Sequence, residues 1–306
     1  MNLGTVPDSW KKSNTKLIPK SAKPTVDQLR PIALTDISYK ILMGILKTKI
    51  ENHLRRNNAI NDMQTGGTAK RRVTENIFIF SYLIEKCVKE KKNLFVTSID
   101  FKKAYDSIDR FKMIEIMQEF KINPKIINLI ANIYHNDKTA LFLNSEEITQ
   151  VDITTGIRQG CNLSGLLFVL VTYKIIEELK AGHSGVRIGN INHTSLFYMD
   201  DALLFTKDEV KTHVIISRIE SISAKYGLKL NKNKCHVLVY NNEKNELDSS
   251  IVSEGNGRKT INGIGITNTI NCTLGCTLMT SSTALRPIRN ISKQKQMHSA
   301  VNYSAC

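Results

Sequence analysis

Two adjacent aspartates inside an otherwise apolar stretch constrain the fold of this chain more than any other feature. The stretch is SLFYMDDALLF, residues 195–205, with Asp200 and Asp201 at its centre. The apolar runs on either side predict two short strands joined by a tight turn, with at least one face buried. An Asp-Asp pair by itself is usually a solvated turn. Two carboxylates at the tip of a buried hairpin would instead suit a metal ion.

A third acid, at the end of another predicted strand, favours the metal site. LFVTSIDF, residues 94–101, is apolar and β-branched, and it places Asp100 near its C-terminal end. Neighbouring strands of an antiparallel sheet lie about 4.8 Å apart, so a strand-end acid can meet the hairpin acids. Carboxylates this close repel one another unless a cation lies between them. The sequence therefore predicts a site for two Mg²⁺ ions, with Mn²⁺ as a substitute.

The charge balance of the chain indicates a polyanionic partner. The sequence has 43 Lys and Arg residues against 28 Asp and Glu residues, a net charge of +15. Such a surplus favours nucleic acid, because each neutralised phosphate releases counterions. Some soluble proteins are equally basic without binding nucleic acid, so the charge alone leaves the partner open.

The cysteines and the ends of the chain bear on its location. The six cysteines form no CxxC pair and no zinc-type spacing, which indicates free thiols in a reducing compartment. The N-terminal residues lack the apolar core of a signal peptide. The longest apolar run, 166–171, is too short to span a bilayer. We therefore expect an intracellular protein of the nucleus and cytoplasm, not secreted, with no membrane partner.

Hydrophobic periodicity predicts an α+β fold. Helices are expected at 36–56, 74–92, 109–120, 124–134, 162–180 and 209–226. Strands are expected at 17–20, 29–34, 93–101 and 235–240, with a hairpin over 138–153 and two or three short strands within 186–205. This order suits an antiparallel sheet backed by helices, the ferredoxin-like arrangement. Residues 281–306 are basic and show no period, which is typical of a disordered tail.

Several segments together resemble the reverse transcriptases of non-LTR (LINE-type) retrotransposons. Around the acids these are LFVTSIDFKKAYDSID, TGIRQGCNLSGLLF and FYMDD. Upstream they are WKKSNTKLIPK, LRPIALTDISYKIL and QTGGTAKRRVTENIF, and downstream GLKLNKNKCHVLVY and CTLGCTL. The segments follow the family's order from about Trp10 to Leu278.

The resemblance implies the fingers and palm of a right-hand polymerase, with a ferredoxin-like palm sheet backed by helices. It places the fingers at 1–92 and the palm at 93–280, with fingers and palm interleaving near 101–155. The basic tail at 281–306 follows. No thumb-like segment is recognised, so we expect the sequence to be a fragment of a longer protein.

The resemblance also implies roles for individual residues. Asp100 and Asp200 match the principal metal ligands and Asp201 the supporting ligand, while Phe101 offers its backbone carbonyl. Lys234 matches the general acid that protonates pyrophosphate. Tyr105 matches an aromatic residue that excludes a ribose 2′-hydroxyl. The nucleotide-binding set is Lys20, Arg30, Phe101, Tyr105 and Gln159. The template- and primer-binding set is Lys70, Arg71, Arg72, Arg158, Tyr198, Met199, Leu274 and Gly275.

The function that the resemblance implies is RNA-directed DNA polymerase activity. The enzyme would add deoxynucleotides to a primer 3′-hydroxyl by two-metal phosphoryl transfer. Its partners would be an RNA template, a DNA or RNA primer and dNTPs. A catalytically dead retrotransposon remnant, a maturase-like RNA-binding module and an RNA-dependent RNA polymerase are alternatives. Tyr105 argues against the last of these.

Overall fold

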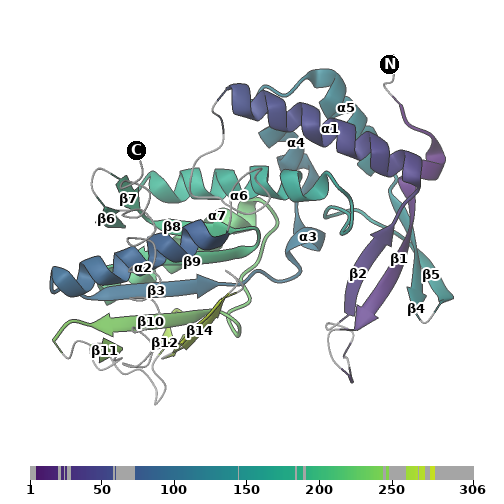
Figure 1. The fold of residues 1–306 in the computed structure, drawn as a ribbon. Coiled ribbons are helices and arrows are strands. Elements are labelled where there is room, and N and C mark those ends of the chain that lie inside the picture. Colours follow the sequence, from purple (N-terminus) through teal and green to yellow (C-terminus); the bar gives the residue numbers. More distant parts are fainter. Residues whose placement is uncertain are drawn as a thin grey trace, which may run out of the picture. The chain divides into compact units, whose positions relative to one another are not determined.

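In a computed structural model, the protein forms two compact units that are built from interleaved stretches of chain (Figure 1). The first unit comprises 1–70, 101–178 and 220–229, and the second comprises 71–100, 179–219 and 230–306. The predicted division at residues 92 and 280 stays a prediction, and the predicted tail lies outside the described residues. The structure describes residues 5–19, 22–23, 25, 29–57, 59, 73–143, 145–182, 185–188, 191–243, 246–247, 260–267, 269–272 and 276–279.

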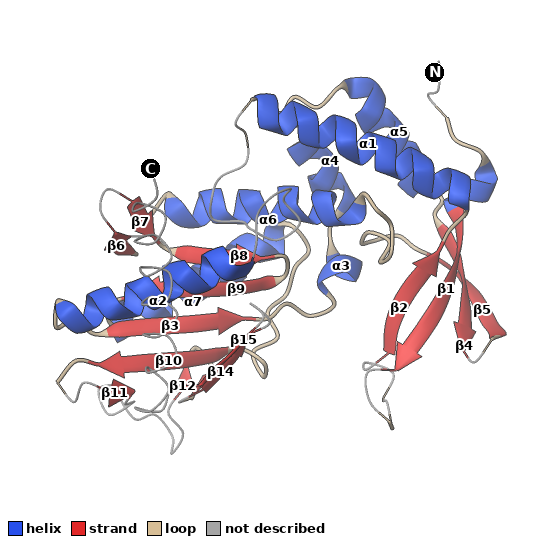
Figure 2. Cartoon of the chain, viewed as in Figure 1, coloured by secondary structure: helices blue, strands red, loops and turns tan. Residues whose placement is uncertain are grey.

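A four-stranded sheet organises the first unit (Figure 2). Its strands are β1 (Lys12–Pro19), β2 (Leu29–Leu34), β4 (Lys138–Leu143) and β5 (Glu146–Asp152), in the order β2-β1-β4-β5. The β1–β4 pair is parallel, and the outer pairs are antiparallel.

Strand β1 begins at Lys12, before the predicted strand at 17–20. The prediction missed its first half because the side chains buried there are polar. Ser13 and Thr15 are buried, and both share hydrogen bonds with the Thr139 hydroxyl of β4, at 3.1 and 2.8 Å. A polar pair of this kind leaves no apolar alternation in the sequence, which is the signal that predicts a strand.

Side-chain caps mark the start of two helices of the first unit. The helices of this unit are η1 (Asp8–Lys11), α1 (Ile37–Arg56), α3 (Ala104–Ser107), α4 (Arg110–Glu119), α5 (Pro124–Tyr134) and most of α6 (Ser164–Lys180). The Asp109 carboxylate accepts hydrogen bonds from the N–H groups of Phe111 and Lys112 at the start of α4. Asn123 caps α5 in the same way, and a proline follows it. Within the described part of the chain, no helix has both the length and the apolar character needed to cross a bilayer.

The second unit is built on a larger sheet with an antiparallel centre. Its strands are β3 (Leu94–Ile99), β8 (Ser195–Tyr198), β9 (Asp201–Thr206), β10 (His236–Asn241), β12 (Thr260–Ile261) and β13 (Ile264–Ile266). Their order is β12-β13-β10-β3-β9-β8, and β11 (Glu246–Leu247) pairs with β10. The pairs from β10 to β8 are antiparallel, whereas β10–β13 is parallel.

Two short hairpins complete the strands described in the second unit. They are formed by β6 (Val186–Ile188) with β7 (Ile191–His193) and by β14 (Thr269–Cys272) with β15 (Cys276–Met279). Residues 186–205 thus contain four strands, and the prediction of two or three was wrong. Strands of three residues are too short to show a period.

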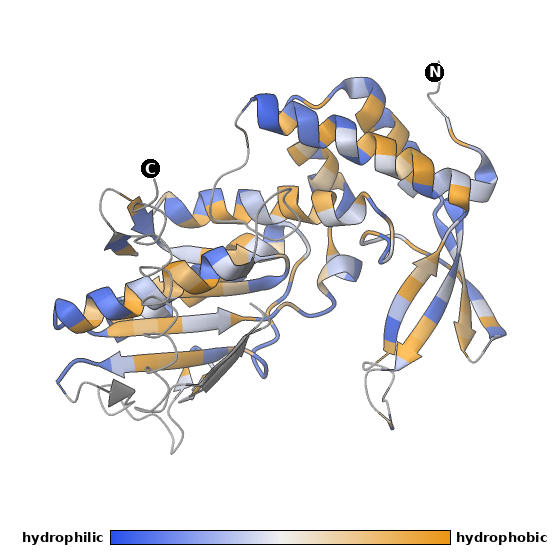
Figure 3. Cartoon of the chain, viewed as in Figure 1, coloured by the Kyte–Doolittle hydropathy of each residue, from blue (hydrophilic) through white to orange (hydrophobic). Residues whose placement is uncertain are grey.

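Helix α2 (Val73–Lys89) and the central strands share one hydrophobic core. Phe80 and Leu83 of α2 are almost fully buried against β3, β9 and β10, and the rings of Phe80 and Phe205 lie 6.1 Å apart. Figure 3 shows apolar residues along both α2 and β3. Full burial of a side chain of this size stabilises a fold by about 1.5–3 kcal/mol. Helix α7 (Glu209–Lys225) contributes Ile215, Ile216 and Ile219 to the buried residues. The α+β prediction is confirmed.

Candidate active site

The Asp-Asp pair lies at the tip of a tight hairpin in the second unit. Tyr198 of β8 pairs with Asp201 of β9, which leaves Met199 and Asp200 as a two-residue turn. Met199 has φ = 56°, a left-handed conformation that costs a residue other than glycine about 1–2 kcal/mol. Asp200 and Asp201 are half-buried, and the flanking strands are buried. The Asp-Asp pair therefore does not lie in a fully solvated turn, which is the usual place of such a pair.

Strand pairing brings Asp100 to the same end of the sheet as Asp201. Ile99, the last residue of β3, is paired with Ala202 of β9. Asp100 follows Ile99, and Asp201 precedes Ala202, so the antiparallel register carries the two acids to neighbouring positions. Three carboxylates are hard ligands of the kind that Mg²⁺ prefers. Among the residues that the structure describes, however, no three His, Cys, Asp or Glu side chains are gathered closely enough to hold a metal ion.

A turn before β10 holds Asp100 through both its backbone and its side chain. The Asn231 Nδ2 amide donates to Asp100 Oδ2 at 3.0 Å, and the Asn231 backbone N–H donates to the Asp100 carbonyl at 2.8 Å. The Asp100 N–H donates to the buried Cys235 sulfur at 3.4 Å. Lys234, exposed in the same turn, donates its backbone N–H to the Asn231 carbonyl at 2.8 Å. The sequence reasoning missed Asn231 and Cys235, although GLKLNKNKC leads into the strand predicted at 235–240.

The GIRQG loop belongs to the first unit and is pressed against its neighbours. Gly156 has φ = 78°, and a Cβ at this position would lie 2.5 Å from the Asp106 carbonyl oxygen. Gly160 has φ = 98°, and its Cβ would lie 3.1 Å from the Ala33 carbonyl oxygen. Only glycine fits both requirements without strain. Between them, Gln159 donates from Nε2 to Asp106 Oδ1 at 3.0 Å, so the side chain that was predicted to bind a nucleotide is held in place.

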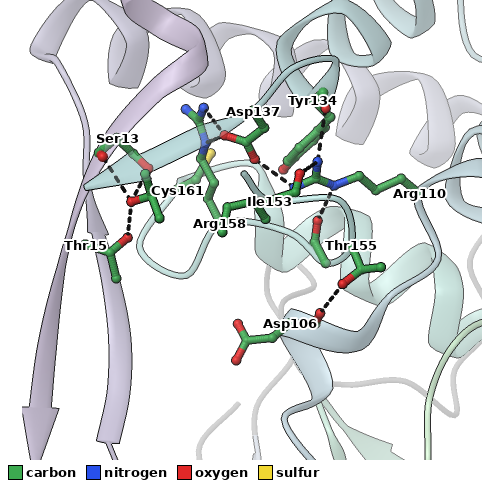
Figure 4. A network of polar contacts seen from close by, with 12 residues as sticks. Ser13, Thr15, Asp106, Arg110, Tyr134, Asp137, Ile153, Thr155, Arg158 and Cys161 are labelled. Atoms are coloured by element: carbon green, nitrogen blue, oxygen red, sulfur yellow. Dashed lines mark hydrogen bonds and ion pairs between the residues drawn. The ribbon is translucent and has the colours of Figure 1, made fainter. Parts of the chain in front are cut away.

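A buried carboxylate, Asp137, joins two arginines behind this loop (Figure 4). Its oxygens lie 2.7 Å from Arg110 Nη2 and 2.6 Å from Arg158 Nη2, and only 2% of the residue is exposed. Arg110 also donates to the carbonyl oxygens of Gly156 and Ile153, at 2.7 and 2.6 Å, and to that of Tyr134. The Asp137–Arg110 pair thus fixes the start of the loop.

Arg158 is enclosed by its partners. Its Nη1 donates to the Trp10 carbonyl at 2.9 Å, and 6% of the residue is exposed. Burial acts to lower the pKa of the guanidinium, but its interactions with Tyr39 and with the Asp137 carboxylate outweigh burial and raise that pKa. These contacts support the loop, and the predicted contact of Arg158 with a template strand stays a prediction. Neither Asp137 nor Arg110 was found from the sequence, because a charged residue in a polar stretch normally lies at the surface.

A cleft of about 300 Å³ lies beside the loop within the first unit. Gln159, Asp106 and the hydroxyl-bearing Ser13, Thr15 and Thr139 are among the residues that line it. Its walls therefore offer both hydrogen-bond donors and acceptors to a polar ligand.

Residues 18–299 match the sequence profile described as reverse transcriptase (RNA-dependent DNA polymerase). The chain belongs to the reverse transcriptase family. The predicted family is thereby confirmed.

Similar proteins from mobile elements indicate which type of reverse transcriptase the chain resembles. The chain is 27% identical over 237 residues to the Pol polyprotein of the type-1 retrotransposable element R2 of Nasonia vitripennis, covering 77% of this chain and 22% of the relative. It is 24% identical to that of the type-2 element R2DM of Drosophila melanogaster, with shares of 76% and 22%. It is 23% identical to the transposon TX1 149 kDa protein of Xenopus laevis, with shares of 68% and 16%. The chain thus spans about a fifth of the length of these relatives, and the predicted non-LTR type is confirmed.

Solved structures of telomerases share the fold. The telomerase of Candida albicans in complex with a fragment of telomeric RNA superposes with a TM-score of 0.56 at 13% identity, over 81% of this chain and 47% of that one. The apo telomerase of Candida tropicalis gives a TM-score of 0.54 at 15% identity, over 88% and 53%. At this identity the likeness concerns the fold alone, and it confirms the predicted fingers-and-palm class.

The remaining predicted residues of this reverse transcriptase domain occupy different environments. The Tyr105 ring stacks on Phe168 in the first unit, with centroids 4.8 Å apart and planes 5° apart. Phe101 is buried, Tyr198 is half-buried, and Arg30 is exposed on β2. Their roles stay predictions. Six further predicted residues lie outside the described part of the chain: Lys20, Lys70, Arg71, Arg72, Leu274 and Gly275.

Proposed function

We propose that this chain carries an RNA-directed DNA polymerase that extends a primer 3′-hydroxyl with deoxynucleotides. The observation that carries the proposal is the register of β3 and β9 in a member of the reverse transcriptase family. Because Ile99 pairs with Ala202 in an antiparallel register, the next residue beyond that pair on each strand is an acid, Asp100 or Asp201, and both lie at one end of the sheet. Such a row of carboxylates repels itself without a cation, and a cation there would meet substrate phosphates.

The acids take the role of holding divalent metal. Asp100 and Asp200 are proposed as principal ligands and Asp201 as the supporting ligand, with the Phe101 carbonyl as a further oxygen. Two Mg²⁺ ions bound in this way, or Mn²⁺ in their place, would supply the positive charge that phosphoryl transfer requires. Lys234 is proposed to donate a proton to the leaving pyrophosphate.

Residues of the first unit are proposed to recognise the nucleotide. Gln159 presents an amide that its bond to Asp106 orients, and Tyr105 presents a ring that its stacking on Phe168 keeps from turning. A fixed ring discriminates by steric exclusion, since a 2′-hydroxyl placed against it has no room. Arg30 and Lys20 would offset triphosphate charge.

The template and primer are proposed to be nucleic acid strands, and the net charge of +15 supports this. The proposed contacts remain Lys70, Arg71, Arg72, Arg158, Tyr198, Met199, Leu274 and Gly275. A location in the nucleus and cytoplasm accompanies this proposal.

Primer extension tests the proposal directly. The protein is incubated with poly(A)/oligo(dT), labelled dTTP and Mg²⁺, beside an Asp200→Asn variant that keeps the shape of the side chain. We expect incorporation by the wild-type protein and a loss of at least about 100-fold in the variant, because a metal ligand is removed. Equal signals from the two proteins would refute the proposal.

An RNA-binding module without catalysis is the second candidate. It is favoured by the positive charge and by the lack of a gathered metal-binding cluster among the described residues. This candidate predicts RNA affinity that is unchanged by Asp200→Asn and by dNTPs. Filter binding with a labelled RNA, repeated with both proteins, separates it from the polymerase.

A further inference from the structure

Asn231 and Asp100 are joined by two separate hydrogen bonds, although 131 positions separate them in the sequence. One bond uses the side chain of Asn231, which donates to Asp100 Oδ2 at 3.0 Å, and the other uses its backbone N–H, which donates to the Asp100 carbonyl at 2.8 Å. The Cys235 sulfur accepts the Asp100 N–H. The turn over 231–235 therefore forms hydrogen bonds with three atoms of Asp100: Oδ2, the carbonyl oxygen and the backbone nitrogen.

The position of this turn in the sheet is fixed by strand pairing. The Asn231 carbonyl accepts from the N–H groups of Lys234 and Cys235, at 2.8 and 3.1 Å, which closes the turn just ahead of β10. His236 of β10 then pairs with Ser98 of β3. Strand β9, which begins at Asp201, pairs with the opposite edge of β3. Asp100 consequently has Asp201 of β9 on one side and the donor of Asn231 on the other.

The side-chain bond has a chemical purpose that the backbone bonds lack. Any residue except proline could supply the backbone N–H that binds the Asp100 carbonyl. The amide of Asn231 instead restrains rotation of the carboxyl group about a torsion that is otherwise broad. It occupies Oδ2 with a neutral donor and leaves the full negative charge of Asp100 to attract a cation.

We propose that Asn231 is a positioning residue for Asp100, orienting its carboxylate for divalent metal. This inference rests on the proposed function, since it assumes that Asp100 is a metal ligand. Partners that hydrogen-bond to metal ligands typically contribute a factor of about 10–100 to metal affinity. The same loss is expected here when only the amide is removed.

Manganese binding measured by electron paramagnetic resonance tests this without relying on catalysis. The signal of free Mn²⁺ is followed during titration of the wild-type protein, Asn231→Ala and Asn231→Leu. The leucine variant keeps the branched shape of asparagine but has no donor, and both variants keep the backbone bonds. Asn233→Ala is the matched control, because Asn233 is exposed in the same turn. Asp100→Asn and Asp200→Asn report on the metal site itself.

We expect both Asn231 variants to bind Mn²⁺ about 10–100-fold more weakly than the control, with unchanged circular dichroism. Affinities within about twofold of the control would overturn the inference, as would a loss of affinity accompanied by loss of the folded spectrum. If the aspartate variants weaken binding and the Asn231 variants do not, this inference alone fails. If the aspartate variants also bind as the wild type does, the proposed metal site fails with it.

Discussion

Removal of the charge of Asp137 is predicted to be among the most damaging single changes in the first unit. The Asp137 side chain is 1% exposed and accepts charged hydrogen bonds from Arg110 and Arg158, at 2.7 and 2.6 Å. Asp137→Asn keeps the shape but leaves two guanidinium groups beside a neutral amide. Breaking a buried ion pair in this way costs about 3–5 kcal/mol. Because Asp137 lines a cleft, water can reach part of the defect, and we expect a value of about 3 kcal/mol.

Urea unfolding followed by tryptophan fluorescence measures this loss. Trp10 is the single tryptophan of the chain, and its carbonyl accepts a hydrogen bond from Arg158, so its emission reports on the same network. The matched control is Asp152→Asn. Asp152 also lines the cleft and pairs with Lys138 at 3.4 Å, but its side chain is 72% exposed. An exposed pair contributes about 0–1 kcal/mol.

Comparing the free energies of unfolding of the two variants tests whether the buried network contributes more than an exposed ion pair. A fall in the free energy of unfolding of about 3 kcal/mol for Asp137→Asn, against less than about 1 kcal/mol for Asp152→Asn, is expected. Equal values would show that the buried network contributes no more than a surface pair, and the reasoning would be refuted.

Three further changes test other parts of the structure. Gly156→Ala should lower the free energy of unfolding by more than the cost of about 1–2 kcal/mol that a left-handed backbone imposes on alanine. The added Cβ would also lie only 2.5 Å from the Asp106 carbonyl oxygen. Urea unfolding measures the loss, and an unchanged free energy of unfolding would contradict the loop geometry. Burial acts to raise the pKa of Glu178, but hydrogen bonds from Lys225 and Tyr226 outweigh it and lower that pKa. Glu178→Gln should therefore cost roughly 1 kcal/mol at neutral pH, and the difference should vanish as the pH falls through the lowered pKa; a difference that grows in acid would be the wrong sign. Burial raises the pKa of the Cys87 thiol to about 11, so iodoacetamide at pH 8 should modify it far more slowly than a model thiol, and labelling at the rate of a free thiol would exclude that environment.

The sequence could predict those helices and strands that have a clear apolar period or recognisable capping residues. Helix α5 lies where it was expected because Asn123 and Pro124 mark its start and its apolar residues repeat at helical spacing. The strand predicted at 93–101 was found for a similar reason, since all six residues of β3 are buried. Strand β1 was predicted too short because Ser13 and Thr15 are polar and buried together, and no local signal distinguishes them from exposed residues.

The same limit explains which parts of the candidate site escaped prediction. Asp100, Asp200, Asp201 and Gln159 stand in segments that resemble a known family, whereas Asn231 and Asp137 act through partners that are distant in the sequence. A polar group removed from water is stable only when those partners are supplied. Hydrogen bonds of 2.6 Å at the buried Asp137 and of 3.0 Å at the half-buried Asn231 show that they are. Substitutions at Asn231 and Asp137 should consequently harm this domain even though neither residue is proposed to touch substrate.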